Sequence, residues 1–598
     1  MGGVAGIVHF RGEPPVRDQA RQLASGVAHR GAHDRGLFME GAVILTHRRG
    51  VGALRQPVSD DRFVVMMDGW LADGDARTVL EQWAKQGERC LSALSGAFAL
   101  VIWDRRLQAL WLVRDAVGQC PLFWSEDTGR LAFCSEMPPL LELPWVSREI
   151  AVENLAEYLS FRYVHAPRTL ARGVSSVPPG HLVRIDGAGA RIQRWWRPPW
   201  AAPGAAMPDD DETVGNIDSL LRQEVERCLR SSGPTALLLS GGLDSSSILY
   251  HAAQILDRPM TTTISMTASQ LDEAPFAARV AKMMGADHEA VRIDDGRFID
   301  ALLEATAAMG APLPNAGGAL QWLLFQELRR SVKVVLSGDG GDEVFGGRGM
   351  DQIAGRLRRA RLIGRLPGPA RLFTQAAARR ARWNDFGVSA ANFGMDRAIG
   401  GSRVFHSAER VRLMADPGQV RPGIRRIALE PMYQEIDSDP LNSILHVWQR
   451  GWLVEDGLAR ADRMAARAGL SVRNPMLGAP ILQAAAALPG DAKVRANRLG
   501  GFVTKWPLRQ AMRGRMPRQL LYRPKRSLPN PLGLWLRAPG ADFLRGQIDD
   551  IQAHDDDLFI PAVVRDLARQ HLEGHADHSL QLWSLILFRL WRGTVLRR

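Results

Sequence analysis

One turn between an apolar strand and a helix constrains this chain more than any other feature. The apolar run 235–239 enters the turn Ser240-Gly241-Gly242-Leu243-Asp244-Ser245-Ser246-Ser247, and a helical pattern follows over 248–255. Such a turn presents backbone N–H groups and a helix N-terminus to an anion. Its two glycines permit close approach of the main chain to phosphate oxygens. The turn therefore predicts an α/β domain that binds phosphate groups.

This turn differs from the two most familiar nucleotide loops. A Walker A loop needs a Gly-Lys pair, and the 598 residues contain none; the Rossmann glycine pattern is also absent. The turn resembles the Ser-Gly-Gly-x-Asp-Ser loop of the PP-loop ATPases, which cleave ATP to AMP and pyrophosphate. The resemblance implies that ATP is held by Leu239, Ser240, Gly241, Gly242, Asp244, Ser245 and Ser246.

A second strand pattern ends in an acidic turn. The run 332–336 leads into Ser337-Gly338-Asp339-Gly340-Gly341-Asp342-Glu343. Three carboxylates this close repel one another, and such a cluster usually holds a cation. At the carboxyl end of a parallel strand the turn would lie beside the phosphate-binding turn. We expect Mg²⁺ between Asp244 and Asp342, although an acidic surface turn is the alternative.

Together the two turns resemble the synthetase domain of class B asparagine synthetases. Further segments follow the order of that family: 272–278, 462–464, 472–477, 505–509 and 523–525. The resemblance implies a catalytic lysine at Lys525, with Lys505 and Arg509 as further candidates for contact with the phosphates. It also implies nucleotide contacts at Ser265 and Gly338. Asp339 is expected to orient or deprotonate an amine, and the alternative is a carboxylate that only stabilises its turn.

The pattern of strands and helices predicts two α/β domains. Short strands joined by Gly-rich turns fill the first part, for example 42–46, 63–67, 98–103 and 109–113. A Pro-rich segment at 197–204 and an acidic run at 209–212 read as a linker. Strands and helices then alternate to about residue 350, which predicts a doubly wound parallel sheet, and the last third reads as helical. We expect domains at 1–200 and 210–598.

The first domain resembles the glutamine amidotransferase domain of the same family, which has an N-terminal-nucleophile αββα fold. Segments 3–7, 29–31, 96–99, 114–115, 121–123 and 135–136 fall in family order. Working members begin Met-Cys-Gly and use the exposed cysteine as nucleophile, whereas this chain has Gly2. The glutamine-holding Asn-Gly-Glu of the family is replaced by Asp68-Gly69-Trp70. The sequence therefore predicts no glutaminase activity.

The loss of the cysteine changes the expected amine. Family members without it use an amine of the substrate; they include β-lactam and carbapenam synthetases and lasso peptide synthetases. The first interpretation is a lasso peptide macrolactam synthetase, which adenylates a side-chain carboxylate of a precursor peptide and joins it to the N-terminal amine. A leader-peptide protease and a leader-recognition protein would be its partners. The alternative is an ammonia-dependent asparagine synthetase or a small-ring lactam synthetase.

Two compositional features bear on the substrate. Nine arginines occur between residues 356 and 382, and they form either a landing site for an acidic peptide or a solvated helical face. Four tryptophans in the later part suit an apolar substrate, but the core is the commoner place for tryptophan. These tryptophans are Trp448, Trp452, Trp506 and Trp535.

Composition narrows the remaining classes. The formal net charge of +12 suits anionic partners, yet no RNA-binding motif is present, so we expect no nucleic acid partner. No apolar run is long enough to span a membrane, and the N-terminus lacks the basic region of a signal peptide. A cytoplasmic protein is expected. The four cysteines show no zinc or redox spacing and are expected to be buried thiols.

Overall fold

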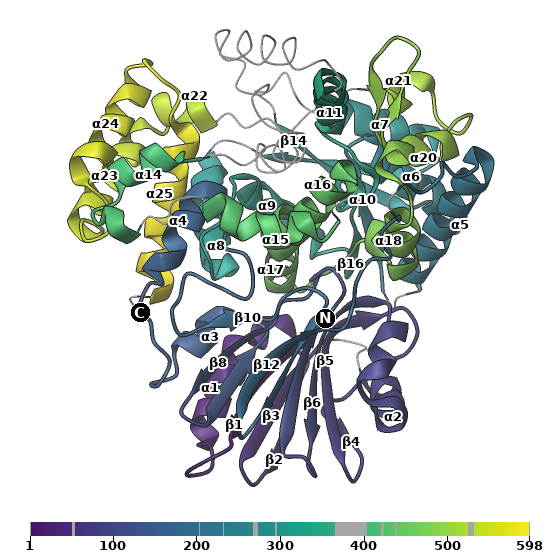
Figure 1. Cartoon of the computed structure of the whole chain (residues 1–598). Helices are drawn as coiled ribbons and strands as arrows, with labels where there is room; N and C mark the ends of the chain where they lie inside the picture. The colour runs from purple at the N-terminus through teal and green to yellow at the C-terminus, as the bar shows by residue number, and fades with distance from the viewer. Residues whose placement is uncertain are drawn as a thin grey trace.

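The computed structural model describes residues 2–596 except 51–53, 203, 231–232, 267–272, 294–295, 365–403, 420–423, 437–438 and 524–531. Two α/β domains lie one above the other in Figure 1, with the strand-rich N-terminal domain below. The predicted two-domain α/β fold is therefore confirmed.

Two six-stranded antiparallel sheets form the N-terminal domain. The first sheet has the order β10-β8-β9-β1-β3-β2 and the second β12-β11-β7-β6-β5-β4. The bounds in the first sheet are β1 Gly2–His9, β2 Asp34–Glu40, β3 Val43–Arg49, β8 Phe123–Asp127, β9 Arg130–Cys134 and β10 Ser175–Ser176. Those in the second are β4 Val58–Ser59, β5 Phe63–Leu71, β6 Gly96–Asp104, β7 Ala109–Arg114, β11 His181–Asp186 and β12 Gly189–Arg194.

The alternation of side chains along these strands explains how the two sheets stack. Val64 and Met66 of β5 enter the core shared by the two sheets, whereas Val65 and Met67 pack on the other face beneath α2 (Ala76–Gln86). Helices α1 (Arg17–Gly26) and α3 (Met137–Leu141) cover the outer face of the first sheet. The result is the predicted αββα architecture.

The C-terminal domain is built on a parallel sheet with the order β15-β14-β13-β16-β17. The bounds are β13 Thr235–Leu238, β14 Met260–Met266, β15 Asp287–Ile293, β16 Val334–Leu336 and β17 Ser471–Arg473. Chain order runs outward from β13 in one direction and then from β16 in the other. The two strands that precede the predicted turns are therefore neighbours at the switch point, where open α/β sheets bind ligands.

Helices cover both faces of this sheet. Helices α5 (Asp210–Leu229), α6 (Leu243–Ala252) and α7 (Ala274–Met283) share one core cluster. Helices α8 (Gly296–Met309), α9 (Gly317–Leu328) and α17 (Ala459–Ala468) share another. The acidic run expected in the linker is instead the first turn of α5, where Asp209 caps Glu212 N at 2.9 Å. Negative charge is favourable at this end of a helix.

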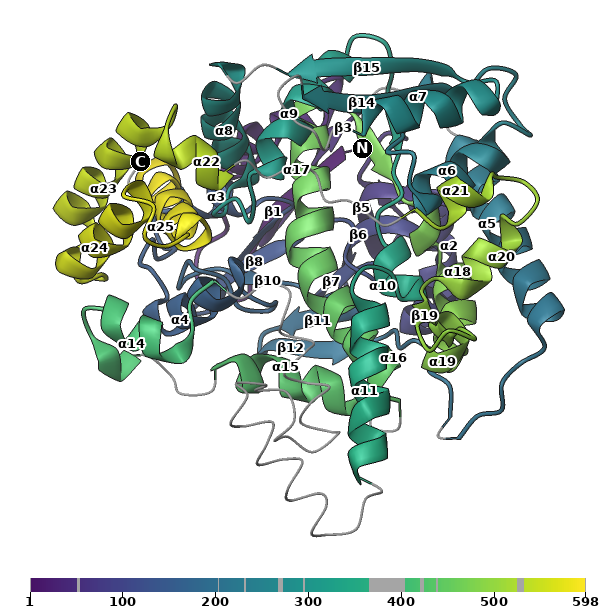
Figure 2. The same ribbon diagram turned by 90° about the horizontal axis from the view of Figure 1, so that it is seen from above.

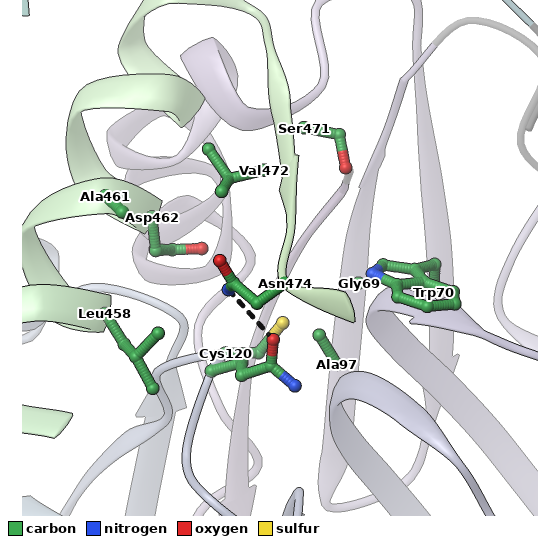
Figure 3. A pocket seen from close by; sticks show the side chains of 11 residues that line it. Gly69, Trp70, Ala97, Cys120, Leu458, Ala461, Asp462, Ser471, Val472 and Asn474 are labelled. Carbon is green, nitrogen blue, oxygen red and sulfur yellow. Dashed lines mark hydrogen bonds between the residues drawn. The ribbon is translucent and has the colours of Figure 1, made fainter. Parts of the chain in front are cut away.

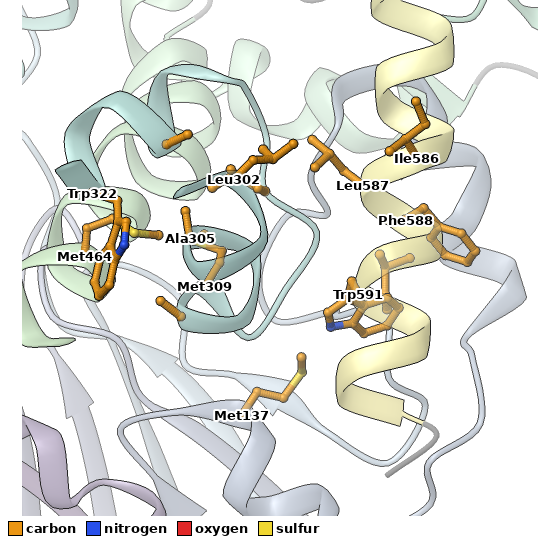
Figure 4. Packing of buried hydrophobic residues seen from close by; sticks show 14 of the residues in the cluster. Met137, Leu302, Ala305, Met309, Trp322, Met464, Ile586, Leu587, Phe588 and Trp591 are labelled. Carbon is orange, nitrogen blue, oxygen red and sulfur yellow. The ribbon is translucent and has the colours of Figure 1, made fainter. Parts of the chain in front are cut away.

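The C-terminal helices join the two domains into a continuous core. They are α22 Leu532–Arg537, α23 Ala541–His554, α24 Pro561–Leu572 and α25 Ser579–Trp591. In Figure 4, Trp591 of α25 lies in one apolar cluster with Met309 of α8 and Met137 of the N-terminal domain. Trp591 Nε1 also donates to Gly310 O at 3.1 Å. This packing fixes how the domains face each other.

A long helical rod crosses the middle of the molecule. It comprises α16 (Pro440–Trp448), the π-helical segment η4 (Gln449–Leu458) and α17. Seen from above in Figure 2, the rod runs between the α5–α7 side and the C-terminal helices. The remaining α-helices and strands of the described residues are α4 Val152–Phe161, α10 Gly341–Phe345, α11 Met350–Gly364, α14 Ser407–Leu413, α15 Ile424–Gln434, α18 Ala479–Ala486, α19 Gly490–Lys493, β18 Arg495–Ala496, β19 Phe502–Val503, α20 Trp506–Ala511 and α21 Arg518–Leu521. Among the described residues, none of the helices is both long and apolar enough to cross a membrane.

Candidate active site

The turn after β13, residues 239–246, is called here the phosphate loop. Leu239 N extends the strand pairing by donating to Thr262 O at 2.8 Å. Gly241 has a φ of +67°, and a Cβ on it would lie about 3 Å from the backbone of α7 at Phe276 and Ala277. Only glycine fits both conditions. The loop is thus pinned between β14 and the first turn of α7.

Serine side chains shape the interior of the phosphate loop. Ser240 Oγ accepts a hydrogen bond from Gly242 N at 3.3 Å and lies 3.2 Å from Ser245 Oγ. Ser240 N donates to Ser245 Oγ at 3.3 Å. These bonds hold the turn open around the start of α6, where helix N–H groups favour a bound anion.

The turn after β16, residues 337–343, is called the acid loop and touches the phosphate loop directly. A Cβ on Gly341 would lie 2.6 Å from Asp244 Cγ, and one on Gly338 would lie 3.1 Å from Ser245 N. Gly340 has a φ of +92°. The glycines therefore allow the two loops to approach across the switch point, as the sequence predicted.

Asp339 is half-buried within the acid loop. Ser337 Oγ donates to Asp339 Oδ2 at 2.9 Å, and Asp339 N donates to Ser337 Oγ at 3.3 Å. This geometry is what a turn-stabilising carboxylate requires. The same side chain lies in the loop that faces Asp244, so the expected role toward an amine stays a prediction.

Lys505 connects the two predicted metal ligands. Its Nζ lies 2.7 Å from Asp342 Oδ1 and also pairs with Asp244 Oδ2. The lysine precedes α20 in a left-handed conformation, φ +50°, and its N–H donates to Gly346 O at 3.2 Å. Sequence reasoning named all three residues, and the structure brings them together.

Arg509 follows on α20. Its Nε donates to Thr504 O at 2.7 Å, and Nη1 is buried without a partner among the described residues. Burial lowers the pKa of Arg509, while the charges of Asp244 and Asp342 oppose that shift. The guanidinium is held by Thr504, a residue that sequence reasoning did not name, and keeps one donor for a ligand.

Two further buried hydroxyls, one in the phosphate loop and one on the neighbouring strand β14, lack partners within the described ranges. They are Ser246 Oγ at the start of α6 and Thr262 Oγ1 on β14, in residues that are 1% and 0% exposed. Buried polar groups are rarely left unsatisfied unless a ligand or water completes them. Ser246 is among the residues predicted from the sequence to bind ATP, whereas Thr262 is not, although three consecutive threonines at 261–263 in a buried strand were an available signal.

The donors around these loops fit a nucleotide with magnesium. Mg²⁺ is commonly held by one or two carboxylates together with phosphate oxygens, and Asp244 with Asp342 supplies two. No group of three or more potential ligands occurs in the part of the chain that the structure describes. The phosphates would complete the coordination of the ion.

Three further residues belong to segments that the sequence predicts to be functional. Ser265 lies near the carboxyl end of β14 and pairs in register with Arg292 of β15. Lys525 lies outside the described residues. Arg523 stacks on Phe276 of α7 with 3.7 Å between Cζ and the ring centre.

The arginines and tryptophans that could contact a substrate lie partly within the described residues. Arg358 and Arg359 are exposed on α11, which fits the solvated-face alternative, and residues 365–382 lie outside the described ranges. Trp448 and Trp535 pack against core clusters. For these two tryptophans the core alternative is correct.

In the N-terminal domain, Arg30 and its partners form a buried group called here the Arg30 cluster. Arg30 donates to Asp68 Oδ2 at 3.1 Å, to Glu136 Oε1 at 3.1 Å and to Asp462 at 2.8 and 3.0 Å. Its side chain has no exposed surface. Burial alone would lower the pKa of Arg30, but the three carboxylates outweigh it and raise the pKa well above its usual value.

Gly2 lies at the edge of this cluster. Its N–H donates to Asp68 Oδ1 at 3.1 Å. A Cβ on Gly2 would lie 2.7 Å from His47 Nε2 and 2.8 Å from Arg48 O. Burial lowers the pKa of His47 to about 4, so this imidazole is neutral at pH 7. The space that a nucleophilic side chain would need is already filled.

A small cavity lies between the domains (Figure 3). Its lining includes Gly69, Trp70 and Cys120 from the N-terminal domain and Asp462 and Asn474 from the other. Its volume is about 20 Å³, which is room for about one water molecule. All four cysteines are buried free thiols, as predicted, and burial raises the pKa of Cys120 well above its usual value.

These features define a class of protein: a doubly wound domain with paired phosphate and acid loops, joined to an αββα domain of amidotransferase type. The asparagine synthase family model matches residues 216–593, and the glutamine amidotransferase domain model matches 66–196. The chain belongs to the asparagine synthase family. Membership makes it an ATP-dependent carbon–nitrogen ligase by class.

Named relatives cover nearly the whole chain. The putative glutamine-hydrolysing asparagine synthetase of Mycobacterium tuberculosis (strain ATCC 25618 / H37Rv) is 29% identical over 90% of this chain and 85% of its own length. The glutamine-hydrolysing asparagine synthetase 1 of Bacillus subtilis (strain 168) is 25% identical over 99% of this chain and 96% of its own. The similarity extends through both domains.

Proposed function

We propose that this protein is a macrolactam synthetase of lasso peptide biosynthesis. It adenylates a side-chain carboxylate of a precursor peptide and closes an isopeptide bond with the peptide's N-terminal amine, releasing AMP and pyrophosphate. The observation that carries the proposal is a contrast within one chain. The synthetase loops are assembled around carboxylates and around donors that have no partner among the described residues, whereas Gly2 and the Arg30 cluster offer no nucleophile and no space for one.

In the first step, ATP binds over the phosphate loop. Mg²⁺, held by Asp244 and Asp342, would neutralise phosphate charge when bound. A carboxylate oxygen of the peptide forms a bond to the α-phosphorus, and the bond from that phosphorus to pyrophosphate breaks. Lys525, Lys505 and Arg509 offset the charge that develops on the phosphates.

In the second step, the peptide's amine attacks the activated carbonyl. The C–N bond forms, AMP leaves with the electron pair of the broken C–O bond, and the amine proton passes to a base. Asp339 is the proposed orienting group or base. Because amine and carboxylate belong to one molecule held by the enzyme, this step is effectively unimolecular.

We also propose that the protein does not hydrolyse glutamine and that its domains span 1–200 and 210–598. Arg30 is engaged by three carboxylates, and Asp68, at the position of the family's glutamine-holding asparagine, accepts from Gly2 N, Arg30 and Ser135. These contacts leave little capacity for glutamine. The domain boundary is supported by the end of β12 at Arg194 and the start of α5 at Asp210.

The alternative is an ammonia-dependent asparagine synthetase or a small-ring lactam synthetase. The relatives named as glutamine-hydrolysing asparagine synthetases favour asparagine as the product, but not ammonia as the source of the amine. The two proposals separate in one experiment. The protein is incubated with ATP, Mg²⁺, the leader-recognition protein, the protease and a precursor peptide encoded by a neighbouring gene, and the peptide is weighed by mass spectrometry. We expect the core peptide minus one water. AMP release with aspartate and ammonia, and none with peptide, would contradict the macrolactam proposal.

A further inference from the structure

The Arg30 cluster lies against the helical rod beneath the acid loop. Asp462, on α17, receives two hydrogen bonds from Arg30, although the residues are 432 positions apart. On the same helix Arg467 lies 3.7 Å from Glu136 of the N-terminal domain. Each domain thus supplies one cation and one carboxylate to the pair of contacts. This crossed arrangement specifies one position of α17 against the N-terminal domain.

A second contact acts on the strand that follows α17. Arg473, the last residue of β17, stacks on the ring of Trp70 with Cζ 4.5 Å from the ring centre. The next residue, Asn474, donates to Gln119 Oε1 of the N-terminal domain at 3.0 Å. Trp70 follows Asp68 and Gly69, the segment that departs from the family's glutamine-holding pattern. The departure therefore places an aromatic ring under β17.

The acid loop is bonded to β17 at one end and, at the other, to η4, which continues directly into α17. β17 pairs with β16 in parallel, and Arg473 O accepts from Ser337 N, the first residue of the acid loop, at 3.0 Å. In the middle of the rod, at the start of η4, Gln449 Nε2 donates to Glu343 O, the last residue of the acid loop, at 2.9 Å. A shift of α17 or β17 would displace Asp339 and Asp342.

We propose that Arg30 and Trp70 are positioning residues of the synthetase reaction: they clamp α17 and β17 and so hold the acid loop against the phosphate loop. The inference rests on the proposed catalytic role of the acid loop. By this proposal, the residues at the position of the family's glutamine site set the geometry of the synthetase reaction but take no part in its chemistry.

The test uses Arg30→Met, Arg30→Lys and Trp70→Leu in the full-length protein. The matched control is Arg62→Met, which removes a 2.8 Å ion pair with buried Asp104 at the other end of β5. Hydrogen exchange is followed in peptides that cover 333–345 and 470–477. We expect exchange at least about ten-fold faster in Arg30→Met and Trp70→Leu, an intermediate rate in Arg30→Lys, and no change there in Arg62→Met.

The kinetic readout is ATP–pyrophosphate exchange with the peptide. We expect kcat per folded molecule to fall about 10–100-fold in Arg30→Met, with the KM for ATP within about two-fold of wild type. Arg30→Lys should recover part of that loss, because it keeps the charge but not the paired hydrogen bonds. If Arg30 only stabilised the fold, its substitution would lower the unfolding temperature and leave kcat per folded molecule unchanged.

Unchanged hydrogen exchange in both Arg30→Met and Trp70→Leu would overturn the clamp, and faster exchange with unchanged kcat would overturn the positioning role. Trp70→Leu leaves every charge of the Arg30 cluster in place, so it decides the question even if Arg30→Met does not fold. Failure of the proposed function would instead show as a wild-type protein without ATP–pyrophosphate exchange. Hydrogen exchange needs no substrate and still tests the clamp.

Discussion

The two polar centres of this molecule use their charges differently. In the Arg30 cluster, a buried guanidinium is matched by three carboxylates of the same chain, and each of its nitrogens has a partner. Around the phosphate loop, Ser246 Oγ, Thr262 Oγ1 and Arg509 Nη1 are buried without partners in the described ranges. A centre that binds ligands keeps hydrogen-bonding capacity, because buried donors must be satisfied by something. The guanidinium of Arg30, by contrast, is satisfied within the protein.

The largest loss of activity is expected from a substitution at Asp342. Asp342→Asn keeps the shape of the side chain but removes one of two carboxylates that would hold Mg²⁺. We expect ATP–pyrophosphate exchange to fall about 10²–10³-fold. Asp351→Asn, an exposed change in the first turn of α11, is the control and should leave the rate unchanged. Equal rates for wild type and Asp342→Asn would refute the metal role.

Arg509 tests whether an unpartnered donor marks ligand capacity. If Arg509 donates to a phosphate of ATP, Arg509→Met removes a charged hydrogen bond worth about 1.5–3 kcal/mol, so ATP should bind about 10–150-fold more weakly. Calorimetric titration measures this, with exposed Arg513→Met as the control. Unchanged ATP affinity would show that Arg509 Nη1 does not face the nucleotide.

Lys493 provides a buried cation with a neutral partner, in contrast to Arg30. Its Nζ donates to Asn442 Oδ1 at 2.7 Å, and burial lowers the pKa of Lys493 to about 7. An unfolded lysine has a pKa of about 10.4. Between these values the unfolded chain binds more protons, so the free energy of unfolding should rise with pH, by up to about 1.4 kcal/mol per pH unit.

Lys493→Met should remove that rise between about pH 7 and 10.4, whereas exposed Lys333→Met should keep it. Urea unfolding at three pH values across this window measures the slope. The same slope in Lys493→Met and wild type would show that the pKa of Lys493 is not lowered in the folded protein.

The smallest expected change is at Gly2. Gly2→Cys restores the missing thiol, yet its Cβ would meet His47 Nε2 at 2.7 Å and the backbone of Arg48 at 2.8 Å. We expect no glutamate release from glutamine. The glutamine-hydrolysing asparagine synthetase 1 of Bacillus subtilis serves as the positive control. Glutamine hydrolysis by the variant would show that the domain still holds an intact glutamine site.

Local patterns made part of this molecule predictable. A buried strand followed by glycine and acidic residues is a pattern of neighbouring residues. Both loops and the strands before them could therefore be predicted from the sequence. Their proximity followed from the rule for parallel sheets. Lys505 was named from a resemblance, and its pairing with Asp244 and Asp342 came only with the structure.

Contacts between distant segments were not predictable from one sequence. The segments 29–31 and 462–464 both stood out as motifs, but nothing in either shows that Arg30 pairs with Asp462 across 432 positions. In the sequence, Trp70 shows only that the glutamine-holding pattern of the family is changed, whereas the structure shows that its ring stacks on Arg473. The first turn of α5 was misread because acidic residues favour both linkers and helix N-termini.

In the proposed reaction, a carboxylate is activated by ATP and is then attacked by an amine that does not come from glutamine. The most direct test labels the reacting side-chain carboxylate of the precursor peptide with ¹⁸O and runs the reaction without glutamine or ammonia. We expect one ¹⁸O atom in each AMP, none in pyrophosphate, and a peptide lighter by one water. AMP without label, or AMP formed only when glutamine or ammonia is supplied, would contradict the proposed reaction.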